Sequence, residues 1–127
     1  MFEHVQFYWN ELITPDVEKA KAFYARALGW TFESMPMPEG EYTIAKVGEN
    51  MVAGLMQTPS DMQGAPAQWY SYVSVDNVDQ RVGTATQAGA QLCRPLFDVE
   101  GVGRIAILQD PTGAIICLIT PTDMPQA

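Results

Sequence analysis

The sequence predicts an α+β fold made of two tandem β-α-β-β-β modules, whose mixed or antiparallel sheets curve and together form a cup. A strand–helix–strand pattern occurs once in each half of the chain. The two copies align at an offset of 61 residues, which matches Trp9 with Tyr70 and Asp16 with Asn77. Repeats of this size commonly bury the open face of one unit against its twin, so we expect a single domain over residues 1–127.

Module one is predicted over about residues 4–57. Residues 5–13 are rich in aromatic and β-branched side chains, as in a buried strand. Thr14 is placed to accept a hydrogen bond from a first-turn amide of the helix that follows, and Pro15 lacks the N–H that would go unpaired there. Gly29 fits the left-handed position that ends this helix. A second strand is expected to start at 30–32, and a turn follows at 35–40. Two further strands are expected at 41–47 and 51–57.

A linker at 58–68, which has no apolar periodicity, leads to module two at about 69–121. Asn77 is predicted to cap the second helix, with Gln80 at capping-box spacing. The strand after this helix carries Pro95, which restricts it to a sheet edge or a bulge. The strands expected in this module are 69–75, 91–97, 104–109 and 114–120.

Composition limits the classes of partner and compartment. The formal net charge of −8 argues against a nucleic-acid partner, because phosphates must be met by a basic surface. No apolar run approaches the roughly 20 residues of a membrane span, and the N-terminus lacks the features of a signal peptide. Cys93 and Cys117 are too few for a disulfide scaffold, which favours a cytoplasmic location.

Three segments of the chain carry a resemblance to a known family: TPDVEKAKAFYARALGW at 14–30, SVDNV at 74–78 and GRIAILQDPTGAIICLI at 103–119. Together with the duplicated module, they resemble the vicinal oxygen chelate superfamily over roughly residues 4–121. Glyoxalase I, bleomycin-resistance proteins and extradiol dioxygenases belong to that superfamily.

The resemblance also implies where a metal would be bound. Enzymes of the superfamily hold one divalent metal inside the cup, with ligands from the first and last strands of each module. The offset of 61 residues carries those positions onto Trp9 and Tyr70, and a second offset of 63 residues, which aligns 48–56 with 111–119, carries them onto Gly54 and Cys117. None of them is a histidine or a carboxylate, so we expect no metal and no cofactor here.

The inventory of residues leads to the same expectation. His4 is the only histidine of the chain, whereas catalytic zinc and non-haem iron sites use several histidines and carboxylates. A magnesium site made only of carboxylates stays open as an alternative. His4 itself is interpreted either as a general base or as a partly exposed residue at a strand edge.

Glu11 is the candidate catalytic residue. It shares strand parity with Trp9, so the two side chains are expected to point into the cup together. Among aromatic walls its carboxyl group would lose solvation, which would raise its pKa and suit it to proton transfer or to a cationic ligand. In the alternative interpretation, Glu11 is structural and accepts hydrogen bonds from amides near the helix start.

The candidate ligand-binding residues are Trp9, Tyr70, Cys117, Met56 and Arg104. The two aromatic rings would stack on a planar guest, and the flexible Met56 thioether suits apolar ligands. Cys117 is either a nucleophile or a small buried apolar residue. Arg104 would clamp a ligand carboxylate, pair with Glu11, or simply lie at the surface.

Two classes of function are compatible with these residues. The first is a homodimeric protein that binds or sequesters a small organic molecule in a metal-free aromatic pocket. The second is an enzyme. It is either a metal-independent enzyme, with Glu11 as general acid or base and Arg104 stabilising an anion. Or it is a lyase or dioxygenase whose metal is held by carboxylates that the sequence does not place.

Overall fold

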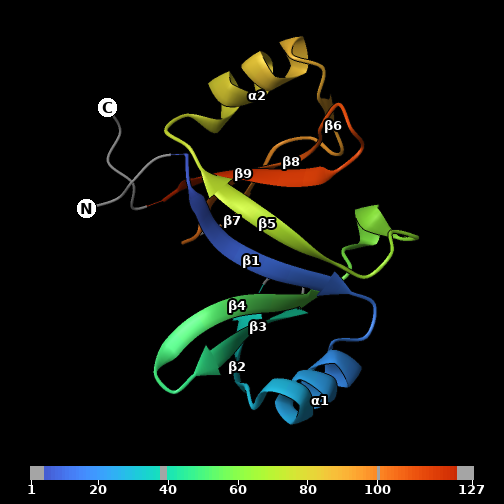
Figure 1. Ribbon diagram of the computed structural model, residues 1–127, viewed down its shortest axis with the longest axis vertical. Helices are drawn as coiled ribbons and strands as arrows, with labels where there is room; N and C mark the ends of the chain where they lie inside the picture. The colour runs from blue at the N-terminus through green and yellow to red at the C-terminus, as the bar shows by residue number, and fades with distance from the viewer. Residues whose placement is uncertain (1–4, 38–39, 100, 123–127) are drawn as a thin grey trace. The chain divides into compact units, whose positions relative to one another are not determined.

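The computed structural model describes residues 5–37, 40–99 and 101–122. Helices and strands alternate in this part of the chain as an α+β fold, which confirms the predicted class (Figure 1). In chain order the elements are β1 (Phe7–Thr14), α1 (Val17–Leu28), β2 (Thr31–Met37), β3 (Gly40–Val47), β4 (Asn50–Gln57), the 3-10 helix η1 (Ser60–Met62), β5 (Gln68–Ser74), α2 (Val78–Gln87), β6 (Gln91–Leu92), β7 (Phe97–Val99), β8 (Gly103–Gln109) and β9 (Ile115–Pro121).

The chain divides into two compact units. We call Trp9–Tyr70 the N-terminal unit, and the described residues of Met1–Tyr8 and Ser71–Ala127 the C-terminal unit. The cup concerns the arrangement of two modules and stays a prediction, as do the module boundaries.

The N-terminal unit contains a four-stranded mixed sheet in the order β2-β3-β4-β1. β2, β3 and β4 pair antiparallel in sequence, and β4 pairs parallel with β1. Helix α1 covers one face of this sheet, because Val17, Ala20 and Tyr24 pack on the buried side chains of Leu12 and Leu55 (Figure 1). Since side chains alternate along a strand, the neighbours of Leu12 point to the opposite face.

The C-terminal unit has its own ladder, in which β5 pairs parallel with β9 and β9 pairs antiparallel with β8. The short strands β6 and β7 both pair with β8. Val78 and Val82 of α2 are buried against Ala106 and Leu108 of β8. The Thr120 hydroxyl accepts a hydrogen bond from Val78 N at 2.9 Å, which fixes the first turn of α2 to β9.

Three local expectations are corrected by the structure. Helix α1 is capped by Asp16, whose carboxylate accepts from Lys19 N at 3.0 Å, whereas Thr14 accepts from Asp16 N before the helix starts. Asp16 caps the helix because its side chain is nearer to the free amides of the first turn than that of Thr14. Strand β2 runs through the expected turn as far as Met37, because an edge strand tolerates proline. The single strand expected at 91–97 is divided into β6 and β7, and Pro95 lies between them.

Other local expectations are confirmed. Asn77 caps α2 and accepts from Gln80 N at 3.1 Å, and Gly29 has the left-handed φ of 75° predicted after α1. Neither described helix has the length and apolar character needed to cross a membrane.

Two glycines of the C-terminal unit test its packing. A Cβ added at Gly103 would lie 2.5 Å from the carbonyl oxygen of Thr120, whereas a Cβ at Gly83, inside α2, would meet open space. We expect Gly103→Ala to destabilise the protein by more than about 1 kcal/mol, and Gly83→Ala to stabilise it by about 0.5–1 kcal/mol. Urea unfolding measures both changes, and a shift of the same sign for the two variants would contradict this packing.

Candidate functional site

A row of hydrogen-bonded side chains lies on the face of the N-terminal sheet opposite α1. Trp9 and Glu11 alternate with the buried Leu12 side and therefore share this face. The indole Nε1–H of Trp9 donates to the hydroxyl of Tyr42, from β3, at 2.9 Å. Tyr42 in turn donates to the Glu11 carboxylate. We call Trp9, Tyr42 and Glu11 the network.

Strand register places Gly54 beside this network. Gly54 pairs with Glu11 on β1 and with Ile44 on β3. The Tyr42 hydroxyl lies directly over Gly54, and a Cβ at that position would overlap it. A glycine inside a strand often marks such a close approach. The Tyr42 ring can therefore lie across β4 only because residue 54 has no side chain.

Burial decides the ionisation of Tyr42. Glu11 is only 7% exposed. Burial, followed by the charge of Glu11, raises the pKa of Tyr42 far above its ordinary value of 10.0, and the hydrogen bond from Trp9 opposes this rise only in part. Tyr42 therefore keeps its proton at physiological pH and presents it to Glu11.

The predicted ligand contact Met56 lies next to the network. It pairs with Tyr42 across β3 and β4, so the two side chains share a sheet face. Met56 also lines a cavity of about 240 Å³, whose other lining residues are Met37, Glu41, Gln57, Thr58, Pro59 and Ser60. An apolar thioether thus connects the network to a concave surface of the same unit.

Tyr70 and Cys117 have surroundings of a different kind. Tyr70 is 3% exposed, and its hydroxyl accepts from the Gln68 amide at 3.0 Å. Cys117 is fully buried and pairs with Tyr72 in the β5–β9 ladder. The burial of Cys117 agrees with the small apolar residue that was one of its two interpretations.

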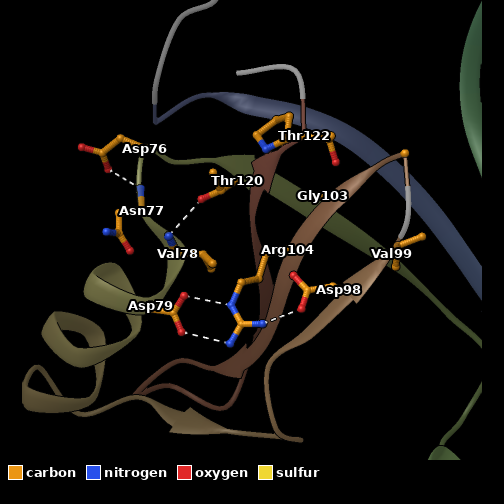
Figure 2. Close-up of a pocket in the computed structure, with 12 residues that line it drawn as sticks. Asp76, Asn77, Val78, Asp79, Asp98, Val99, Gly103, Arg104, Thr120 and Thr122 are labelled. Atoms are coloured by element: carbon orange, nitrogen blue, oxygen red, sulfur yellow. Dashed lines mark hydrogen bonds and ion pairs between the residues drawn. The ribbon is translucent and has the colours of Figure 1, made fainter. Parts of the chain in front are cut away.

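Arg104 lies in the C-terminal unit, between two aspartates (Figure 2). Its Nε and Nη2 donate to the Asp79 carboxylate at 2.8 and 3.1 Å, and its Nη1 donates to Asp98 at 2.8 Å. The guanidinium thus donates to carboxylates from α2 and β7, and its pairing with Glu11 or with a ligand carboxylate stays a prediction. Arg104 lowers the pKa of Asp79, while Asp79, more than Asp98, raises that of Arg104.

This ion-pair cluster borders a concave surface region of about 550 Å³ between the start of α2 and the ends of β8 and β9. The cluster was not predicted from the sequence. The one signal for it is Asp79 in the first turn of α2, where a carboxylate interacts favourably with the helix dipole. Because Asp79 and Asp98 are largely exposed, the pairs are screened by solvent and contribute little to stability.

The positions implied for a metal do not suit one. Trp9 and Tyr42 bind each other, residue 54 offers no donor atom, and the space over it is filled by the Tyr42 hydroxyl. Within 5–37, 40–99 and 101–122, no three His, Cys, Asp or Glu residues come close enough to hold a metal ion. His4 lies outside these described residues.

Comparisons with known proteins agree with this fold. A family model described as "Bleomycin resistance protein-like N-terminal" matches residues 6–48. "Putative glyoxylase CFP32" of Mycobacterium tuberculosis is 40% identical over 114 residues, which are 89% of this chain and 43% of that protein. The chain belongs to the vicinal oxygen chelate superfamily. "Anthracycline biosynthesis protein DnrV" of Streptomyces peucetius is 32% identical over 119 residues, covering 84% of this chain and 43% of that protein.

Solved structures of the superfamily show the same fold. Methylmalonyl-CoA epimerase from Mycobacterium tuberculosis matches with a TM-score of 0.60 and 16% identity, over 91% of this chain and 87% of that one. Homoprotocatechuate 2,3-dioxygenase from Brevibacterium fuscum matches with a TM-score of 0.62 and 18% identity, over 93% and 37%. At these identities the likeness concerns the fold alone. The chain spans less than half the length of the curated relatives it matches.

The pKa of Tyr42 yields a pH prediction. Because the folded-state value is raised above the unfolded one, the contribution of Tyr42 to stability is fully present below a pH of about 10 and is lost as the pH rises further. Above that pH, the free energy of unfolding of the wild type should fall more steeply than that of Tyr42→Phe, by at most about 1.4 kcal/mol per pH unit. Urea unfolding at several alkaline pH values measures this difference, and parallel pH curves would contradict it.

Proposed function

We propose that the face of the N-terminal sheet opposite α1 binds a small organic molecule. Trp9 and Tyr42 supply aromatic surface, Met56 supplies a flexible apolar wall, and Glu11 supplies the polar anchor. The observation that carries the proposal is the network itself: a nearly buried carboxylate accepts from Tyr42, Tyr42 accepts from Trp9, and the neighbouring Met56 lines a cavity.

The free-energy cost of burying the Glu11 carboxylate favours a role in ligand binding over a purely structural one. A buried carboxylate destabilises a fold unless hydrogen bonds compensate for lost hydration, and an apolar side chain would pack on a sheet at lower cost. Fixed polar groups among aromatic and apolar ones are typical of small-molecule sites. The names of the relatives, a glyoxylase and an anthracycline biosynthesis protein, also concern small organic molecules.

A second candidate function is metal-independent proton transfer with Glu11 as general acid or base. The hydrogen bond from the Tyr42 hydroxyl to the Glu11 carboxylate favours it, because two proton-carrying groups in direct contact can relay a proton. Tyr70, Cys117 and Arg104 stay predicted ligand contacts: the first two are buried, and the third donates to aspartates. The proposal also includes a homodimeric assembly and a cytoplasmic location. Sedimentation of the purified protein tests whether it is a dimer.

The test is a thermal-shift screen of small organic molecules against metal-free protein. For a hit, we expect Glu11→Gln and Trp9→Phe to weaken binding by about tenfold, which corresponds to about 1.4 kcal/mol. Arg81→Gln is the matched control, because it removes an exposed charged side chain that pairs with Asp76 and belongs to no candidate site, and it should leave the affinity unchanged.

The outcomes separate the two candidates. A hit that the wild type turns over and that Glu11→Gln binds without turnover would support proton transfer. A hit that is bound and never changed would support sequestration. If Glu11→Gln and Trp9→Phe leave the affinity for every hit unchanged, the ligand lies elsewhere and the proposal for this face is wrong.

A further inference from the structure

The cavity of about 240 Å³ in the N-terminal unit is separate from the network. It lies where β4 ends and the chain continues into η1, and its lining also includes the last residue of β2 and the start of β3. Trp9, Tyr42 and Glu11 are not among its lining residues. We call it the β4 cavity and treat it as a possible site of its own.

One part of this lining is apolar and flexible. Met37 and Met56 are both half-buried. They share one face of the sheet, because Met35, two residues before Met37, pairs with Tyr42, and Tyr42 pairs with Met56. The β3 partner of Met37 is Gly40, where an added Cβ would meet open space. Two thioethers therefore border an unfilled position, and such side chains adapt to apolar guests and contact aromatic rings favourably.

Glu41 gives the lining its only formal charge. The residue is exposed, and its carboxylate counts toward the net charge of −8 at pH 7. Of the described residues that line the cavity, none is Lys, Arg or His. Backbone donors are also scarce, since Thr58 N is bound to the carbonyl of Thr14 and Pro59 has no N–H. The lining is thus better suited to a cation than to an anion.

The volume of the β4 cavity limits the size of the guest. Sites for drug-sized molecules measure about 300–1,000 Å³, and this cavity is slightly smaller. A single ring with a short chain is a guest of suitable size.

We infer that the β4 cavity binds a small primary amine, with its apolar body against Met37 and Met56 and its ammonium group paired with Glu41. The inference goes beyond the proposed function, because it adds a second site that requires neither Trp9 nor Glu11.

The experiment compares benzylamine with benzyl alcohol, two probes of similar size of which only the amine is a cation at neutral pH. The protein carries ¹³C in its methionine methyl groups, of which the chain has seven, and NMR spectra are recorded during each titration. We expect benzylamine to shift the methyl signals of Met37 and Met56. The signal of Met51, which is 61% exposed at the other end of β4, should stay in place.

A matched pair of variants separates the proposed ion pair from the general attraction of an acidic protein for cations. Glu41→Gln should weaken benzylamine binding by about fivefold, as expected for a largely exposed ion pair, and leave benzyl alcohol binding unchanged. Glu49→Gln removes the same charge from the turn between β3 and β4, outside the cavity, and should weaken benzylamine binding by less than about twofold.

The same logic applies to the apolar part of the lining. Met56→Ala should weaken the binding of both probes, whereas Met51→Ala, on the same strand but outside the cavity, should change neither affinity. Glu41→Gln alters an exposed side chain, so the test of the ion pair does not depend on how well Met56→Ala folds.

Three results would overturn the inference. The first is that benzylamine leaves the signals of Met37 and Met56 in place. The second is an equal loss of benzylamine affinity in Glu41→Gln and Glu49→Gln, which would assign the attraction to the acidic surface as a whole. The third is a loss in Trp9→Phe with none in Glu41→Gln, which would place the amine at the network and support the proposed function instead.

Discussion

The hydroxyl of Tyr42, lying over Gly54, is the contact on which the candidate site depends. It accepts from Trp9 and donates to Glu11, so one oxygen atom orders an indole from β1 and a carboxylate from the same strand. A buried carboxylate requires such partners. The contact exists because β3 and β4 pair in a register that places a tyrosine beside a residue without a side chain.

This contact lies at one of the positions that the resemblance to the superfamily implies for a metal ligand. In the superfamily the last strand of each module supplies a ligand, and here that position in the N-terminal unit is glycine, covered by a phenol. The Tyr42 hydroxyl is thereby held between Trp9 and Glu11, and burial together with the charge of Glu11 raises the pKa of Tyr42. In the described part of the C-terminal unit, Cys117 is fully buried, and the charged side chains around Arg104 lie at the surface.

Features that depend on neighbouring residues in the sequence, such as helix caps, could be predicted, whereas contacts that depend on the register between strands could not. The cap at Asn77 and the left-handed Gly29 follow from side-chain chemistry within a few residues. Strand parity predicted that Glu11 shares a sheet face with Trp9. The contact of Tyr42 with both residues was not predicted, since it depends on the register between β3 and β4, which one sequence does not reveal. The interior Gly54 was the available signal.

Hydrogen exchange of the indole N–H groups tests the central contact most directly. In the wild type the Trp9 N–H is bound to Tyr42 and the Trp69 N–H to Tyr24, so the second serves as an internal reference. In Gly54→Ala, we predict that exchange at Trp9 accelerates by about tenfold or more, which corresponds to about 1.4 kcal/mol of lost protection, while exchange at Trp69 is unchanged. Unchanged exchange at Trp9 in a folded Gly54→Ala variant would contradict the account.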